Sequence, residues 1–216
     1  MLGACWNENL VLLGFAVRPG KVLQLVTDVA DVPTFSPQLA LSSEHGYLRP
    51  YRIEDADTVF AAVRESIETV SRWMPWCHAG YAEAESIAWI ERCLSSWQTN
   101  QAYEFGMFDA ANEYLGGAGI NQLDPLNKRA NLGYWVRESR QKQGFATAAT
   151  RALAHFGFAT LGLTRVEIVA ASENTASRRV AEKAGANFEC LARNRLVIHG
   201  VPVSAAVYSL VPNVDA

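Results

Sequence analysis

The sequence has few of the residues that mark metal-binding or disulfide-rich proteins. Its 216 residues include four cysteines, Cys5, Cys77, Cys93 and Cys190, with no C-x-x-C pair and no metal-ligand spacing. Zinc sites use closely spaced ligands, and disulfide scaffolds use many cysteines in short secreted chains. The scattered positions therefore predict free thiols in a cytoplasmic protein without a bound metal.

Long runs of one kind of residue are also missing. No apolar stretch approaches the roughly 20 residues of a membrane-spanning helix. No run of like charges occurs in a chain whose net charge is -3, whereas nucleic-acid-binding proteins usually carry a basic patch or stripe. We therefore expect neither a membrane nor a nucleic acid as a partner. The motif G-x-x-x-x-G-K-[ST] is absent too, which argues against an NTPase.

The composition is that of an ordinary globular protein, with 50% hydrophobic and 19% charged residues. The length suits one domain with an appendage. Residues 1–46 are predicted to be an N-terminal extension: two short strands, 10–17 and 22–26, around the turn dipeptide Pro19-Gly20, followed by a linker. No chemistry is evident in this segment.

From Tyr47 onward the hydrophobic pattern becomes regular. Helical spacing is found after Glu54-Asp55 and over residues 83–97, 144–160 and 174–184. Strand-like stretches are found at residues 47–53, 103–109, 114–122, 131–137, 164–171, 187–198 and 203–211. Early strands followed by alternating strands and helices predict an α/β protein, with a mixed sheet and helices on both faces.

The turn at residues 141–146, Q-K-Q-G-F-A, lies between a predicted strand and a predicted helix. A glycine-containing turn at the head of a helix presents several free backbone N–H groups in one direction. Together with the positive end of the helix dipole, these donors favour phosphate oxygens. The turn alone is a weak pattern, so its value depends on the flanking motifs.

Five segments together carry a resemblance to a known family: residues 124–128 leading to 132–136, then 141–146, 174–177 and 182–185. Across about four-fifths of the chain, their order and spacing resemble those of GNAT-fold N-acetyltransferases. The chain is most similar to the branch of the RimJ- and RimL-type ribosomal-protein N-terminal acetyltransferases. The resemblance implies a GNAT domain over residues 47–213, with a twisted sheet of about seven strands that splays between the fourth and fifth.

The resemblance also implies where coenzyme A binds. The pyrophosphate would meet the turn and the start of its helix, with Phe145 pointing its ring into the core; the residues concerned are Gln141, Lys142, Gln143, Gly144, Phe145, Ala146 and Thr147. The pantetheine arm would lie along the fourth strand, against the main chain of Trp135, Val136 and Arg137. An N–H near Val136 would stabilise an oxyanion. Asn174 would cap its helix and also contact the pantetheine.

Catalysis needs a proton donor for the leaving thiolate and a base for the amine. By resemblance, Ser177 is the donor, although a capping or surface serine fits the same position. The family's glutamate base matches Leu196 here, which leaves the base open. Glu104, Asp124 or a base acting through one water are the candidates, and each carboxylate also fits a solvated strand or turn residue.

The acceptor site is implied by a loop between the first two helices, where residues 73–76 read W-M-P-W. Trp73 and Trp76 are either core residues or the acceptor-binding wall of the family, and Tyr134 is counted with them as substrate-binding. Arg193 and Arg195 are candidates for meeting an acidic group of the acceptor.

The expected function is transfer of the acetyl group of acetyl-CoA to a primary amine, by direct attack through a tetrahedral intermediate. The acceptor is either a protein N-terminus or a small-molecule amine. The alternative is a non-catalytic acyl-CoA-binding or sensor domain. Family habit implies a homodimer.

Overall fold

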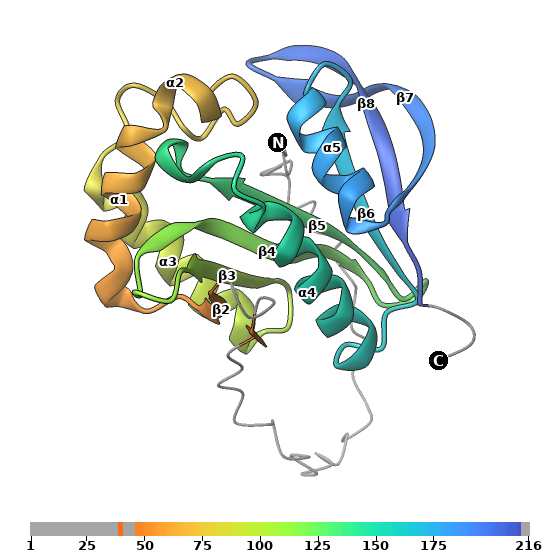
Figure 1. Cartoon of the computed structure of the whole chain (residues 1–216), viewed down its shortest axis with the longest axis horizontal. Helices are drawn as coiled ribbons and strands as arrows, with labels where there is room; N and C mark the ends of the chain where they lie inside the picture. Colours follow the sequence, from red (N-terminus) through yellow and green to blue (C-terminus); the bar gives the residue numbers. More distant parts are fainter. Residues whose placement is uncertain (1–38, 41–45, 213–216) are drawn as a thin grey trace, which may run out of the picture.

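A computed structural model describes residues 39–40 and 46–212 (Figure 1). The predicted strands at 10–17 and 22–26 lie outside the described residues. The strands form one sheet in the order β1-β2-β3-β4-β5-β6-β8-β7. Their bounds are β1 Leu39–Ala40, β2 Tyr47–Pro50, β3 Tyr103–Phe108, β4 Tyr114–Asp124, β5 Arg129–Val136, β6 Arg165–Ala171, β7 Asn187–Ile198 and β8 Val201–Leu210. The seven predicted strands are confirmed, and the two-residue β1 is added at the edge.

The pairing of β5 with β6 is the feature that shapes the molecule. These two strands are parallel, whereas every other neighbouring pair in the described sheet is antiparallel. Their pairing stops at Asn131 opposite Glu167, although β5 continues to Val136 and β6 to Ala171. The remaining halves of the two strands therefore diverge, and the predicted splay is confirmed.

Helices cover both faces of the sheet, as predicted (Figure 1). Three lie before β3 in the chain: α1 (Ala56–Glu65), α2 (Ile67–Val70) and α3 (Glu83–Gln98). The other two are α4 (Phe145–Ala159), which follows β5, and α5 (Thr175–Ala184), which follows β6. Short 3-10 turns occur at Ile53–Asp55 and Glu138–Arg140. The predicted strand at 47–53 ends early, at Pro50, because the first of these turns leads directly into α1.

Strand β5 shows how the two faces are filled. Side chains alternate along a strand, so Tyr134 and Val136 join the cluster around α4, whereas Trp135 joins the cluster around α1 and α3. A third cluster lies beyond the splay and joins β6, β7 and β8; its buried members are Val169, Ala171, Leu196, Ile198 and Ala205. Trp73, from the loop after α2, packs against this third cluster.

The tip of the β7–β8 hairpin reaches the helices on the other side of the splay. The ring Nε2 of His199 lies 2.8 Å from the main-chain oxygen of Ser71, just after α2. With the packing of Trp73, this contact bridges the two sides of the splay at its open end. In the described part of the chain, no helix is long and apolar enough to cross a membrane.

Candidate active site

The turn before α4 presents main-chain donors. Lys142 and Gly144 adopt positive φ angles of 64° and 91°, and Gly144 caps the helix without a side-chain hydrogen bond. The N–H groups of Lys142, Gln143 and Ala146 have no hydrogen-bond acceptor among the described residues. The first turn of α4 contains no acidic residue. These donors at the positive end of a helix dipole suit an anion.

The glutamine side chains of this turn hold it in place. Nε2 of Gln141 donates to the main-chain oxygen of Val136 at 3.1 Å and to Oγ1 of Thr69 at 3.2 Å. Nε2 of Gln143 donates to the main-chain oxygen of Ser139 at 3.2 Å. The glutamines therefore shape the turn, and its main chain is left to meet a ligand.

The start of α4 is anchored by Phe145, whose side chain packs in the core as predicted. Lys142 is exposed, whereas Ala146 and Thr147 are half-buried. The small Ala146 leaves the main chain of the first turn open to close approach.

Alternate residues of β5 direct their main-chain groups toward β4 and toward the splay. The N–H of Arg137 donates to the main-chain oxygen of Leu115 in β4 at 2.8 Å. By this alternation, the main-chain groups of Trp135 point toward β4, and those of Tyr134 and Val136 point into the splay. Only Tyr134 and Val136 are therefore placed to pair with an extended ligand there.

The side chain of Arg137 has a structural role. Its guanidinium pairs with the carboxylate of Glu65 and also donates to the main-chain oxygen of Tyr114 at 3.2 Å. The Arg137 guanidinium, with the N–H and side chain of Ser139, lowers the pKa of Glu65 to about 2. These contacts tie the end of β5 to the end of α1.

Asn174, Ser177 and Tyr134 form a buried group on the α4–α5 side of the splay. The predicted cap is confirmed, since Oδ1 of Asn174 accepts from the N–H of Ser177 at 3.1 Å. The Tyr134 hydroxyl lies 3.1 Å from both the main-chain oxygen and the Oγ of Ser177. Burial raises the pKa of Tyr134, so its hydroxyl stays protonated at neutral pH.

Glu104 lies on the opposite face of the sheet and is 8% exposed. Nδ2 of Asn121 donates to its Oε1 at 3.0 Å, and Nδ2 of Asn131 donates to Oδ1 of Asn121 at 2.9 Å. Burial raises the pKa of Glu104 to about 7, with the Asn121 hydrogen bond acting in the opposite direction. A carboxyl group poised near neutral pH has the properties of a general base.

Two glycines connect Glu104 with the splay. Gly119 of β4 pairs with Glu104 on one side and with Gly133 of β5 on the other. A Cβ atom on Gly119 would lie 1.9 Å from Oε2 of Glu104, so the carboxylate sits directly above this glycine. Because Gly133 also lacks a side chain, neither glycine obstructs the sheet surface between the carboxylate and the edge of β5.

Asp124, the other carboxylate candidate, lies at the closed end of the splay. It ends β4, accepts from Nδ2 of Asn127 at 2.8 Å and from Nε of Arg129 at 3.1 Å. The hydrogen bonds from Asn127, followed by those from Arg129, lower its pKa. Arg129 is paired with Arg165 where β5 and β6 are still joined. The structure therefore brings Glu104, and not Asp124, near the open part of the splay.

Both candidate tryptophans pack against the cluster around α1 and α3, and Trp73 also packs against the third cluster. Trp76 packs edge-on against Trp135 of β5, with ring centroids 5.6 Å apart. Trp73 packs against the cluster that contains Leu196, which is 2% exposed. At this position the family resemblance implies a glutamate, but the chain has a buried apolar residue. Arg193 and Arg195 are exposed on β7.

A cavity of about 360 Å³ opens beside Trp73. Its lining comes from the loop after α2, the β6–α5 connection and the β7–β8 hairpin: Arg72, Trp73, Ala171, Ser172, Glu173, Ile198, Val203 and Ser204. Our sequence reasoning missed Arg72 and Glu173. Arg72 directly precedes Trp73, and Glu173 directly precedes Asn174. Their position next to these candidate residues could have indicated them. Within residues 39–40 and 46–212, no group of His, Cys, Asp or Glu side chains is arranged to hold a metal.

Comparison with known families agrees with this geometry. The acetyltransferase (GNAT) domain family matches residues 47–187 of the chain. The chain belongs to the GNAT acetyltransferase family. As a GNAT enzyme, it is an acetyl-CoA-dependent acetyltransferase. The free N–H groups before α4 suit the pyrophosphate of coenzyme A, and the splay suits its peptide-like arm.

Two proteins similar to this GNAT enzyme match it over most of their length. The Bacillus subtilis protein named "Putative ribosomal N-acetyltransferase YdaF" is 29% identical over 174 residues, covering 78% of this chain and 92% of the relative. A solved Vibrio cholerae structure, described as a "putative ribosomal-protein-serine acetyltransferase", is 33% identical and covers 83% of this chain and 99% of that one, with a TM-score of 0.72.

A further solved structure shares the fold. It is RimL, an L7/L12 α-N-protein acetyltransferase in complex with coenzyme A, with 22% identity and a TM-score of 0.75. The match covers 83% of this chain and 100% of RimL.

Proposed function

We propose that this GNAT enzyme acetylates a primary amine by direct attack of the amine on the thioester of acetyl-CoA. The observation that carries the proposal is the buried carboxyl of Glu104, with a pKa of about 7, above glycines that lead to the splay. An amine acceptor is also supported by the names of the relatives, which include ribosomal N-acetyltransferases.

Glu104 acts as the general base. A protonated amine with a pKa of about 8 to 10 must lose a proton before it can attack. Glu104 accepts this proton, directly or through one water on the surface above Gly119 and Gly133. The hydrogen bonds from Asn131 to Asn121 and from Asn121 to Glu104 hold the carboxylate in position.

The main chain of β5 stabilises the developing oxyanion. As nitrogen bonds to the acetyl carbon, the carbonyl oxygen gains negative charge. The N–H groups of Tyr134 and Val136 point into the splay, where they can donate to this oxygen. Fixed main-chain donors of this kind need no rearrangement during the reaction.

Ser177 donates the proton that the departing sulfur takes when the carbon–sulfur bond breaks. A thiol of this type has a pKa of roughly 8.5, so a nearby donor helps it to leave. Tyr134 lies 3.1 Å from Oγ of Ser177 and positions the serine hydroxyl. We do not propose a non-catalytic binding domain. The reason to consider one was that Leu196 replaces the glutamate base of the family, and Glu104 offers another carboxyl group for this role.

The proposed cell compartment, oligomeric state and domain boundary come from the sequence. Cys77, Cys93 and Cys190 are free thiols, which supports a reducing compartment such as the cytoplasm. The homodimer stays a prediction from family resemblance, as do the boundary between residues 1–46 and 47–213 and the roles of the individual site residues.

Thiol release tests the proposed function. The protein is incubated with acetyl-CoA and a panel of amines that contains amino acids, short peptides and a polyamine, and free coenzyme A is measured. We expect release that depends on at least one amine, together with an acetylated product detected by mass. Thermal stabilisation by acetyl-CoA without release for any amine would overturn catalysis, and no stabilisation would overturn donor binding as well.

A further inference from the structure

We propose that the cavity beside Trp73 binds an acceptor that carries a carboxylate as well as its reacting amine. Arg72 binds the carboxylate, and Glu173 attracts the amine. This inference rests on the proposed acetylation of an amine and adds the chemical class of the acceptor.

The walls of the cavity are fixed by contacts between its three segments. His199 and Ser71 join the hairpin tip to the loop after α2 through a 2.8 Å contact. The N–H of Ser172 donates to the main-chain oxygen of Ser204 at 2.9 Å, and Nη1 of Arg178 donates to the main-chain oxygen of Ser172 at 3.2 Å. The cavity is therefore held in shape before any ligand arrives.

The cavity is close to the proposed reaction centre. Ala171, in its wall, is the last residue of β6 and lies at the open end of the splay. Glu173 directly precedes Asn174, the residue that caps α5 and hydrogen-bonds to Ser177. An amine held beside Glu173 is thus next to the segment that carries the proposed proton donor.

Opposite charges face this cavity without forming an ion pair. Neither Arg72 nor Glu173 has an ion-pair partner among the described residues, and they do not pair with each other. The guanidinium of Arg72 lies over the ring of Trp73, 4.8 Å from its centroid. Stacking of this kind holds the guanidinium and leaves its N–H groups available for a planar carboxylate.

The rest of the lining is mainly apolar and sharpens the choice of ligand. Trp73, Ile198 and Val203 offer apolar surface to the body of the acceptor. A polyamine would place a second positive charge beside Arg72, and a purely anionic ligand would meet Glu173. A zwitterion satisfies both charges. Two sources have this chemistry: a free amino acid or short peptide, and a protein N-terminus followed by an acidic residue.

The contribution of the carboxylate is tested with pairs of acceptors in which one member has a carboxylate and the other has an amide in its place. The first pair is L-phenylalanine and phenylalaninamide, and the second is two hexapeptides that begin Ser-Asp and Ser-Asn. We expect kcat/KM to be roughly tenfold or more higher for the carboxylate member of at least one pair, because hydrogen bonds between charged groups are strong. The pair with the preference identifies the source.

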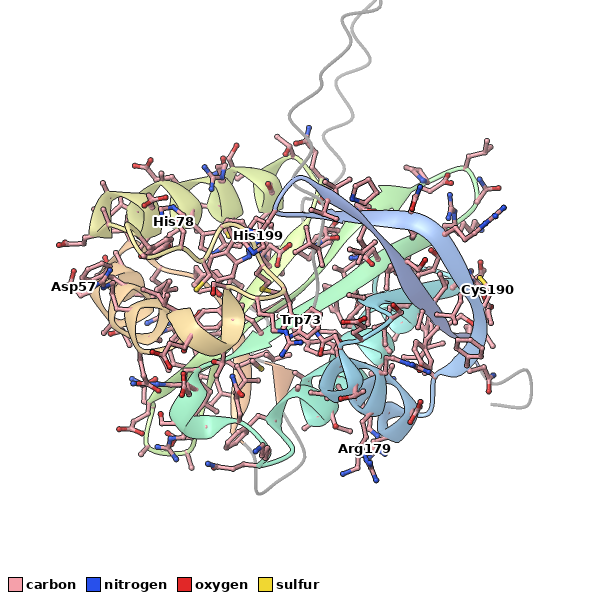
Figure 2. All side chains as sticks on the ribbon, turned by 90° about the horizontal axis from the view of Figure 1, so that it is seen from above. Asp57, Trp73, His78, Arg179, Cys190 and His199 are labelled. Carbon is pink, nitrogen blue, oxygen red and sulfur yellow. The ribbon has the colours of Figure 1, made fainter. Side chains whose placement is uncertain are left out.

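Variants assign the preference to the cavity. Arg72→Ala should raise KM for the carboxylate acceptor roughly tenfold and leave the amide acceptor and the KM for acetyl-CoA within about twofold. Glu173→Gln should raise KM for both members of the pair. The control is Arg179→Ala, because Arg179 is exposed on α5 and points away from the molecule (Figure 2); it should match the unmodified enzyme.

A charge reversal guards against simple loss of folding. Arg72→Glu should lower activity with the carboxylate acceptor and raise activity with a diamine of similar size. Equal activity on carboxylate and amide acceptors, or an Arg72→Ala variant that keeps the preference, overturns this inference while leaving the proposed function intact. If no amine is acetylated although acetyl-CoA binds, the proposed function itself has failed.

Discussion

The donor half and the acceptor half of the proposed active site are built differently. The donor half uses three short segments, residues 134–136, 141–147 and 174–177, and offers mainly main-chain N–H groups, which Gly144 and Asn174 help to shape. The acceptor half combines side chains that are far apart in the chain, such as Arg72 and Glu173. A main-chain site depends on local conformation, whereas a side-chain site depends on how distant elements pack.

This difference has consequences for substitution. In the donor half, most side chains can change as long as the turn keeps its conformation. Within this half, substitution of Gly144 should therefore weaken binding of acetyl-CoA most. In the acceptor half, single side chains carry the chemistry, so their loss should be severe. The effects below run from the largest expected to the smallest.

Glu104→Gln should give the largest loss. The amide keeps the size of the side chain and can still contact Asn121, but it cannot take a proton. We expect kcat/KM to fall roughly 100-fold or more, with thermal stabilisation by acetyl-CoA unchanged. In the unmodified enzyme, kcat/KM should rise with pH through about 7, and this step should vanish in the variant. Activity within threefold, with the pH step retained, would exclude Glu104 as the base.

Gly144→Ala should impair the donor half alone. Gly144 has a φ of 91°, and an L-residue in this left-handed region costs roughly 1–2 kcal/mol. We expect the KM for acetyl-CoA to rise roughly tenfold with little change in kcat. Gly162→Ala is the matched control, since its φ is 64° and it lies in an exposed turn away from the site. Equal changes in KM for both variants would argue against a phosphate seat at Gly144.

Ser177→Ala tests the proton donor between the two halves. We expect kcat to fall about tenfold, because a thiolate is already a moderate leaving group, and the KM for acetyl-CoA to stay within about twofold. Tyr134→Phe removes only the neighbouring hydroxyl and should cause a smaller loss in kcat. Turnover that is unchanged by Ser177→Ala across the pH range would reject the role of donor.

The stability of the protein should carry a pH signature from Glu104. Its pKa in the folded state, about 7, is raised from the ordinary value of 4.5. Between these values the unfolded chain ionises while the folded one stays protonated, so stability falls as pH rises, by at most about 1.4 kcal/mol per pH unit. The Tm of Glu104→Gln relative to the unmodified protein should increase from pH 4.5 to 7 and level off above it. A constant difference in Tm would contradict burial of an ionisable carboxyl.

Gln143→Ala should have the smallest effect. This side chain donates a hydrogen bond to the main-chain oxygen of Ser139, and the proposed phosphate donor at this position is the N–H group. We expect the KM for acetyl-CoA to change by no more than about twofold. A tenfold rise would mean that the donor half depends on side chains after all, and the contrast between the halves would weaken.

Much of the fold was predictable because it rests on local patterns. The strand-like stretches and the helical spacing in the sequence were enough for seven strands and four long helical stretches. The cap at Asn174 and the core position of Phe145 are confirmed for the same reason. The splay came from family resemblance, since no periodicity marks where two strands stop pairing.

The acceptor half could not be predicted to the same depth. Glu104 and Asp124 look alike in the sequence, and only the burial of Glu104 and the ion pair of Asp124 distinguish them. Arg72 and Glu173 come together because the β7–β8 hairpin returns to the loop after α2. Contacts between elements this far apart leave no pattern in a single sequence.

Between the diverging ends of β5 and β6, the arm of coenzyme A would take the position of an additional strand. When the arm of coenzyme A fills this gap, the amide hydrogens of Tyr134 and Val136 change from exposed positions to interior ladder positions. Their exchange with deuterated solvent should then slow, while amides at the paired end, such as that of Asn131, change little. Hydrogen exchange of individual amides would thus report binding of the donor without any acceptor present.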